Sequence, residues 1–419
     1  MTPQPSTAQS AFDVYMWPSS ARRVVGTCVA INMLDGLDVL VLSYVAPALS
    51  KEWGLSGSAL GSVFSVGLFG MMLGSVVLGS LADRFGRRLI ILAALILAAA
   101  AMTVSAFAET LPQLLLVRFI AGLGIGTLIP TVSVLAAQHA PAGKAGQAIA
   151  AVQSGYPLGS IIAGLATAPL IQVIGWRGCL AGAGLVTLLL VPVAMRFAHD
   201  KEYGKEYDKE GARQDAERRG IAQLYKPETL IQTVILWCAI FLTFGVLYFL
   251  ISWIPKLAVD AGLPQTQAII AATVYNIGAF SGTVTLPRFK GRYRTAQVVA
   301  VFLSAGAIFL LIYGLASLAI LPLLAVAFLL GFTVQGGFNG FYGLASEIYA
   351  ESVRATGMGW AAGVGRAGAV LGPLAAGWIL DMHADMWVLF VAFATPLGCA
   401  AILSVFLGRA QYRGTAEKA

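Results

Sequence analysis

The stretch Gly79-Ser-Leu-Ala-Asp83-Arg84-Phe-Gly86-Arg87-Arg88 joins two apolar segments near residues 60–80 and 88–108. Gly79 and Gly86 would allow a close helix approach and a tight turn. Asp83 and the arginines could form a charge network that holds one state of a gate. Plain anchoring by positive charge would explain the arginines, but it would explain neither Asp83 nor the glycines. The stretch therefore predicts a gated membrane protein.

The composition excludes an ordinary soluble domain. Of 419 residues, 58% are hydrophobic and 11% are charged, whereas soluble domains carry roughly a quarter charged residues. The 47 glycines suit helices that approach closely in lipid. The four cysteines lie inside apolar stretches without CxxC spacing, so neither a disulfide framework nor a metal site is expected. The net charge of +7 comes from basic residues that flank apolar segments, which argues against a nucleic-acid partner.

Apolar windows of about 20 residues predict an all-α membrane protein with twelve transmembrane helices. The one long charged segment, residues 198–228, is expected to be a cytoplasmic linker between an N-terminal six-helix bundle, 1–197, and a C-terminal six-helix bundle, 229–419. A weak repeat, Leu135-Ala-Ala-Gln138 and Leu344-Ala-Ser-Glu347, supports two related halves. The predicted spans lie near residues 24–48, 60–80, 88–108, 113–137, 147–170, 178–197, 229–253, 266–286, 296–316, 321–345, 357–380 and 387–408.

The basic residues also predict the orientation. Of the 27 Lys and Arg residues, 22 fall on the side of the two termini, and only Lys51, Arg177 and Lys256 fall on the opposite side. Cytoplasmic loops carry the excess of Lys and Arg, so both termini are expected in the cytoplasm.

Two acids stand in the first span, in the run Asp35-Gly-Leu-Asp38. Residues three apart lie about 60° apart around a helix, so both carboxyls share a face. Burying one ionised carboxylate near the bilayer midplane costs about 2.5–3.5 kcal/mol or more, so intramembrane acids indicate function. Repulsion between them favours protonation of one, and we expect a proton-coupling site here. The alternative is that the acids only pair with Arg118 or Arg366.

Arg118 and Arg366 are the two basic residues inside spans. A guanidinium binds a carboxylate in bidentate fashion and stays protonated, so each arginine is a candidate for binding an anionic substrate. A purely structural salt bridge is the alternative for each.

Several motifs along the chain resemble one family. The run Glu347-Ile-Tyr-Ala-Glu-Ser-Val-Arg354-Ala-Thr-Gly, the Asp35–Asp38 element, the Asp83 loop, Gly363–Pro373 and Tyr248–Pro255 are similar to the aromatic acid:H+ symporter family of the major facilitator superfamily. The resemblance implies uptake of benzoate, hydroxybenzoate or protocatechuate with protons. It implies functional roles for Asp35, Asp38, Asp83, Arg118, Arg354 and Arg366. The chain departs from the family at Gln138, where members often carry an acid.

An aromatic substrate also needs apolar, π-rich contacts. Tyr248, Tyr275 and Tyr342 are candidates, although most aromatic side chains in membranes only pack. Gln335 and Asn339 are four residues apart on one helix face, so they could bond a ring hydroxyl or a neighbouring helix. The residues expected to gate transport are Gly79, Asp83, Arg84, Gly86, Arg87, Arg88, Glu347 and Arg354.

The sequence contains no P-loop and no cluster of metal ligands, so we expect an ion gradient as the energy source and no cofactor. The overall prediction is a monomeric importer in a bacterial inner membrane, with two bundles that rock around one central site to carry a small aromatic acid anion and protons. One alternative is an efflux antiporter, because residues 368–377 (GAVLGPLAAG) resemble a Gly-Pro signature of exporters. Another is a membrane receptor for the same acid.

Overall fold

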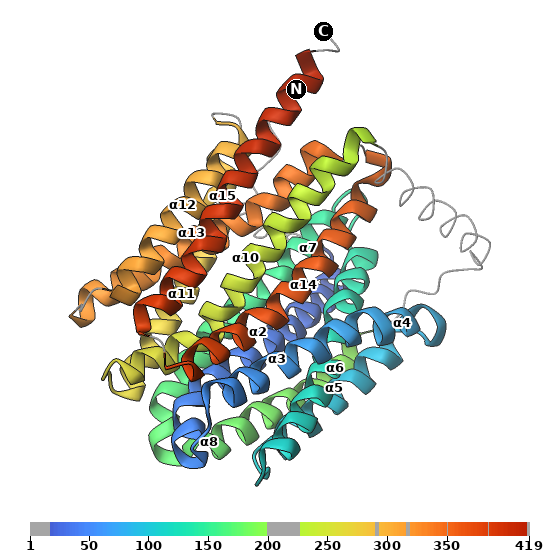
Figure 1. Cartoon of the computed structure of the whole chain (residues 1–419). Coiled ribbons are helices and arrows are strands. Elements are labelled where there is room, and N and C mark those ends of the chain that lie inside the picture. The colour runs from blue at the N-terminus through green and yellow to red at the C-terminus, as the bar shows by residue number, and fades with distance from the viewer. Residues whose placement is uncertain are drawn as a thin grey trace. The chain divides into compact units, whose positions relative to one another are not determined.

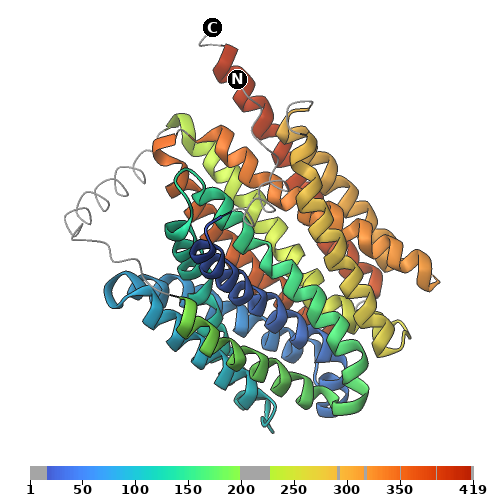
Figure 2. The ribbon, with the colours of Figure 1, turned by 180° about the vertical axis from the view of Figure 1, so that it is seen from behind.

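The computed structural model describes residues 17–198, 227–289, 293–315, 319–349, 351–383 and 385–416. The predicted linker, residues 198–228, lies almost wholly outside these ranges. Helices make up the described chain (Figures 1 and 2). They are α2 (Ser19–Trp53), α3 (Gly57–Leu73), the π-helical turn η2 (Gly74–Leu78), α4 (Gly79–Phe85), α5 (Arg87–Ser105), α6 (Leu111–His139), α7 (Ala145–Gln153), α8 (Gly155–Phe197), α10 (Pro227–Asp260), α11 (Gln265–Thr285), η3 (Leu286–Phe289), α12 (Thr295–Leu315), α13 (Ile320–Ile348), α14 (Glu351–Asp381) and α15 (Met386–Ala416).

Eleven segments in the described part of the chain are long and apolar enough to cross a membrane. One of them, Ala145–Phe197, has 53 residues. A straight helix of that length would be about 80 Å long, whereas a bilayer core is about 30 Å thick. Gly175 interrupts it with a φ of 67° and a ψ of −179°, a conformation that favours glycine. The interruption lies between the predicted spans 147–170 and 178–197. The chain is thus an all-α, multi-pass membrane protein.

Two compact units make up the chain. Unit 1 contains residues 1–201, 249–276 and 373–383, and unit 2 contains 202–248, 277–372 and 384–419. Unit 1 therefore includes the end of α10, the first part of α11 and the last turns of α14. The predicted domain boundaries at 197 and 229 stay a prediction.

In unit 1, α2 packs against α8, and α6 packs against α3 and α5. Small residues allow the contact between α3 and α6. A Cβ atom on Gly122 would lie 2.1 Å from the Gly67 carbonyl oxygen, and one on Gly126 would lie 2.0 Å from the Met71 carbonyl oxygen. Both distances are far below contact distance, so only glycine fits at these two positions. The two backbones touch directly, as small residues permit in membrane helices.

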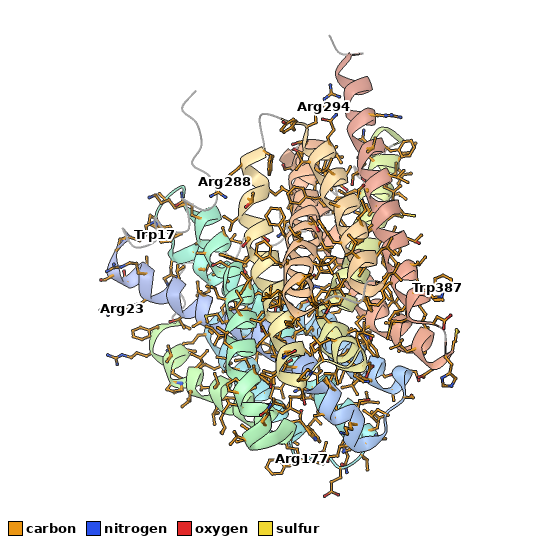
Figure 3. All side chains as sticks on the ribbon, turned by 90° about the vertical axis from the view of Figure 1, so that its left-hand side faces the viewer. Trp17, Arg23, Arg177, Arg288, Arg294 and Trp387 are labelled. Carbon is orange, nitrogen blue, oxygen red and sulfur yellow. The ribbon has the colours of Figure 1, made fainter. Side chains whose placement is uncertain are left out.

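In unit 2, α12 packs against both α13 and α15. Basic side chains lie at one end of this unit: Figure 3 shows Arg288 and Arg294 near that end and Trp387 toward the other. In unit 1, Arg23 lies in the first turns of α2. Arg177 donates to Glu52, which lies in the last turn of the same helix. The predicted orientation, with both termini in the cytoplasm, stays a prediction.

Candidate functional site

Arg118 is positioned by the start of α6. A capping box formed by Thr110 and Gln113 begins this helix, because each residue bonds a backbone N–H that the first turn leaves without a partner. Arg118 follows about two turns later, and its side chain is buried, with 2% of the residue exposed. An arginine buried at membrane depth requires acceptors for its donors.

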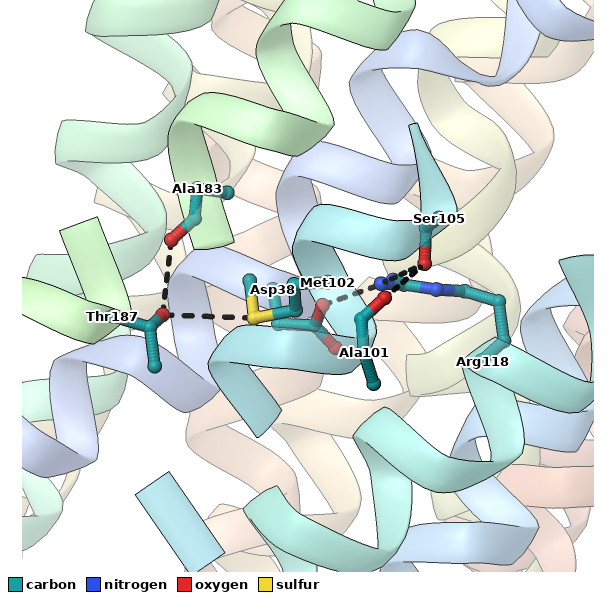
Figure 4. Close-up of polar contacts among 7 residues, drawn as sticks. All are labelled: Asp38, Ala101, Met102, Ser105, Arg118, Ala183 and Thr187. Carbon is teal, nitrogen blue, oxygen red and sulfur yellow. Dashed lines mark hydrogen bonds and ion pairs between the residues drawn. The ribbon is translucent and has the colours of Figure 1, made fainter. Parts of the chain in front are cut away.

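Two side chains supply acceptors to Arg118, as Figure 4 shows. Its Nη1 donates to Asp38 Oδ1 of α2 at 2.9 Å, and its Nη2 donates to Ser105 Oγ at the end of α5 at 3.1 Å. The Ser105 hydroxyl donates in turn to the carbonyl oxygen of Ala101 at 2.8 Å. Because its hydrogen is used there, the serine oxygen presents lone pairs to Arg118. Three helices thus converge on one guanidinium.

One nitrogen of the guanidinium makes no hydrogen bond. Arg118 Nε is buried and has no hydrogen-bond partner among the described residues. A cavity of about 20 Å³ lies beside it, lined by Asp38, Val39, Leu42, Phe64, Gly67, Leu68, Met71, Arg118 and Ser252. This volume is large enough for about one water molecule. The arginine thus adjoins a small, mainly apolar space with spare hydrogen-bonding capacity.

The end of α10 lines part of the cavity within unit 1, through Ser252. Ser43 Oγ lies 2.7 Å from the Ile251 carbonyl oxygen and 2.9 Å from that of Ser252. Trp253 lies edge-on to Phe64 with ring centroids 5.7 Å apart, and its indole N–H donates to the Pro373 carbonyl oxygen at 3.1 Å. The serine bonds attach this segment to α2, the ring contact attaches it to α3, and the indole bond attaches it to α14.

The Arg118–Asp38 pair is buried, and its two opposite charges neutralise each other. A buried ion pair gains stability only when its geometry compensates for the loss of hydration, and removing one partner typically costs about 3–5 kcal/mol. Protonation of Asp38 would leave the Arg118 cation without its counter-ion. A carboxylate from a ligand could then take that place, bonded through the planar fork of the guanidinium.

The other acid of the pair, Asp35, lies about one turn earlier on α2 and is 8% exposed. Tyr275 of α11 belongs to the same unit and is 1% exposed. Its hydroxyl has no hydrogen-bond partner among the described residues.

The remaining predicted binding residues lie in unit 2. Phe244 stacks on Tyr248 at 5.8 Å and meets Phe338 edge-on at 4.5 Å, and Phe338 meets Tyr342 edge-on at 5.7 Å. Arg366 of α14 lies within electrostatic reach of Tyr342. This aromatic row, Phe244–Tyr248–Phe338–Tyr342, therefore has a cation beside it.

The two amides predicted to bond a ring hydroxyl sit on α13. Asn339 donates to Thr283 Oγ1 of α11 at 2.7 Å, which is the helix–helix alternative for that side chain. Gln335, one turn earlier, is half-buried.

The predicted gating residues lie around two helix ends. Gly86 adopts a φ of 90° between α4 and α5, so it makes the turn that its residue type allows. Arg88 donates to the Met195 carbonyl oxygen at 2.7 Å, and Glu347 accepts from Thr295 at 2.5 Å. A Cβ on Gly79 would lie 3.3 Å from Pro130.

Four further predicted gating residues complete this set. Arg84 lies over the Phe85 ring, 5.5 Å from its centroid, and Arg87 begins α5. Asp83 and Arg354 lie on α4 and α14, and their side chains fall outside the described residues.

Ser105 and Ser252 belong to the site but were not predicted from the sequence. Ser105 precedes Arg118 by 13 residues, across the turn between α5 and α6. A polar residue near the end of one span and an arginine near the start of the next are a usable signal for such a bond. Ser252 carried no signal, because a serine in an apolar helix usually bonds its own backbone.

Comparison with known proteins places these features in a family. The family model described as Major Facilitator Superfamily matches residues 28–322 and 236–418. The 4-hydroxybenzoate transporter PcaK of Pseudomonas aeruginosa is 30% identical, with 91% of both chains covered. The 3-(3-hydroxy-phenyl)propionate transporter of Escherichia coli is 32% identical, covering 91% of this chain and 93% of its own.

A solved D-xylose-proton symporter has a TM-score of 0.74 at 16% identity, covering 91% of this chain and 96% of its own, and it shares the fold. The chain belongs to the Major Facilitator Superfamily and, as its motifs predicted, to the aromatic acid:H+ symporter family within it.

Proposed function

We propose that this chain imports a small aromatic carboxylic acid, of the benzoate or hydroxybenzoate type, together with protons. The observation that carries the proposal is the buried Arg118–Asp38 pair beside a cavity, with the Nε–H group of Arg118 left without a partner among the described residues. Two relatives at 30% identity or above, named as transporters of hydroxylated aromatic acids, support the substrate class.

The pair suggests how the anion and the proton are coupled. In the empty site the Asp38 carboxylate neutralises Arg118. When a proton reaches Asp38, the substrate carboxylate replaces it as the partner of the guanidinium. The buried site then has the same net charge empty and loaded, so neither state leaves an uncompensated charge at membrane depth. Without the proton, the loaded site would hold two anions against one cation and would carry a net negative charge. One proton per anion therefore accompanies each binding event at this site.

Asp35 belongs to the same proposal as the second proton-coupling acid. It shares the buried face of α2, so it can pass a proton to Asp38 through a water molecule. Arg366, with the aromatic row of unit 2, is a second candidate for carboxylate recognition, and Tyr275 a further aromatic contact.

The remaining parts of the proposal concern the membrane. We propose twelve crossings in two six-helix bundles, with the break at Gly175 separating the fifth from the sixth. Both termini face the cytoplasm of a bacterium, the protein lies in the inner membrane, a monomer is the transport unit, and alternating access moves the substrate.

Reconstitution tests the proposal. Purified protein in proteoliposomes is given radiolabelled benzoate, 4-hydroxybenzoate and 3-hydroxyphenylpropionate, with an inward proton gradient of about one to two pH units or none. We expect accumulation only with the gradient, collapse on adding a protonophore, and no transport of the matching amides, which lack a carboxylate. Uptake at the same rate with and without the proton gradient would contradict the coupling of substrate to protons. Transport of the amides at the same rate as the acids would contradict the role of Arg118 as an anion-binding residue.

A further inference from the structure

The N-terminus of α3 receives an acid from far along the sequence. A first helical turn leaves backbone N–H groups without acceptors. In α3 the N-cap Ser56 bonds one of them, Ala59 N, at 3.2 Å. Two more donate to Asp381, the last residue of α14: Gly57 N to Oδ1 at 2.5 Å and Ser58 N to Oδ2 at 2.9 Å. Both carboxylate oxygens are thus used in capping a helix more than 300 residues away in sequence.

The backbones meet beside this carboxylate. A Cβ on Gly377, one turn before Asp381, would lie 2.2 Å from the Gly57 carbonyl oxygen, and a Cβ on Gly61 would lie 2.7 Å from that of Pro373. The contact between α3 and α14 therefore runs for more than a turn along each helix. The two backbones lie close together because glycines at these positions place no side chain between them. The Asp381 carboxylate lies at one end of this contact.

We infer that Asp381 is a gating residue: its carboxylate latches the end of α14 onto the N-terminus of α3 and keeps the non-cytoplasmic entrance of the transporter closed. This inference rests on the proposed function, because the charge-based topology places these helix ends on the side opposite to the termini. Alternating access requires contacts between the two halves of the sequence to open in one state. Two charge-assisted bonds at the positive end of a helix supply a contact that forms and breaks as one unit.

The latch depends on the negative charge of the Asp381 carboxylate. Asp381→Asn keeps the shape, yet an amide has one acceptor oxygen and would turn its NH2 group toward the other N–H. One bond and the attraction to the helix dipole are lost together. We expect the open-entrance population to rise about tenfold, which corresponds to about 1.4 kcal/mol.

Labelling of a cysteine reports this population directly. In a background without the four native cysteines, Ser252→Cys places a thiol in the cavity, at a residue 3% exposed. Intact cells are treated with a membrane-impermeant maleimide. We expect Asp381→Asn to raise the labelling rate about tenfold. Gly377→Ala should raise it as well, by forcing the helices apart while Asp381 remains. One control should leave the rate unchanged: Asp385→Asn, which changes an exposed acid four residues beyond Asp381.

The outcomes are distinct. Unchanged labelling in both Asp381→Asn and Gly377→Ala overturns the latch, and so does an equal rise in Asp385→Asn, because loss of any acid near this helix end would then be sufficient. If one variant fails to reach the membrane, the other decides. The assay needs no transported substrate, so a failed uptake assay with a positive labelling result would reject the proposed substrate and keep the latch.

Transport kinetics separate gating from simple damage. A more open entrance should lower the KM for external substrate and also lower the maximal rate, because closure becomes slower. A variant that is merely less stable would lose maximal rate at an unchanged KM. The second pattern in Asp381→Asn would contradict the gating role.

Discussion

Replacing Asp38 by Asn tests the central pair. The amide keeps the size of the carboxylate and can still accept one hydrogen bond from Arg118 Nη1, which is 2.9 Å from Asp38 Oδ1 in the parent. A hydrogen bond to a charged group contributes about 1.5–3 kcal/mol, and a bond between neutral groups about 0.5–1.5 kcal/mol. The substrate carboxylate therefore competes for Arg118 with an amide whose hydrogen bond is weaker by about 1.4 kcal/mol. The affinity of the protein for the substrate should rise about tenfold.

Proton-driven accumulation should disappear in the same variant. An amide does not take up and release a proton, so binding of the anion no longer requires one. Exchange of labelled for unlabelled substrate across the membrane should persist. Substrate should also stabilise the variant against heat more than it stabilises the parent, because it supplies the counter-ion that Arg118 has lost.

Three measurements check this prediction. Titration calorimetry at pH 6 and pH 8 gives the affinity and its pH dependence, proteoliposomes with and without a proton gradient give accumulation and exchange, and a thermal-shift assay gives stabilisation. Glu52→Gln is the matched control, since Glu52 is an acid on the same helix, α2, whose side chain is 46% exposed. Accumulation at the parent level in Asp38→Asn, or a loss of affinity, would refute the exchange of partners at Arg118.

Other substitutions extend the test. Arg118→Lys keeps the charge but loses the planar fork, so calorimetry should show binding weakened by about tenfold or more. Arg366→Ala should weaken binding of the acid while leaving that of its amide unchanged. Restored affinity in Arg366→Ala with Asp35→Asn would show instead that these two residues form a pair. Gly126→Ala would place a methyl group 2.0 Å from a carbonyl oxygen of α3, so it should lower stability by about 1–3 kcal/mol in a thermal-shift assay. Gly146→Ala, where a Cβ meets no atom within 4 Å, should not.

Hydropathy was sufficient to predict the long apolar helices, whereas the count of twelve crossings stays a prediction. The span expected at 113–137 corresponds to α6, Leu111–His139, and the span at 296–316 corresponds to α12, Thr295–Leu315. Such segments are found readily because the bilayer demands about 20 apolar residues, whatever the tertiary packing. The break at Gly175 was placed less well. The hydropathy pattern predicted a loop of several residues between two spans, whereas a single glycine with positive φ is sufficient.

The spacing of Asp35 and Asp38 predicted a shared face, and both residues are buried on α2. Which acid would meet which arginine was not predictable, because Asp38 and Arg118 are 80 residues apart. Their meeting depends on how α2, α5 and α6 pack. The same holds for Asp381, which looks like an ordinary acid at the end of a span. Its importance arises only from the helix end that lies against it.

The direct backbone contact of α3 and α6 has a practical consequence for anyone who wishes to change what this protein carries. At Gly122 and Gly126 the backbones of α3 and α6 are too close for any side chain. A library that varies these two glycines would therefore consist mostly of misfolded chains. The side chains of Phe64, Leu68 and Met71 project from α3 into the cavity instead. Trimming or reshaping them alters the space beside Arg118 without moving the helices. A search for altered selectivity should therefore randomise these three positions together and leave the glycines fixed.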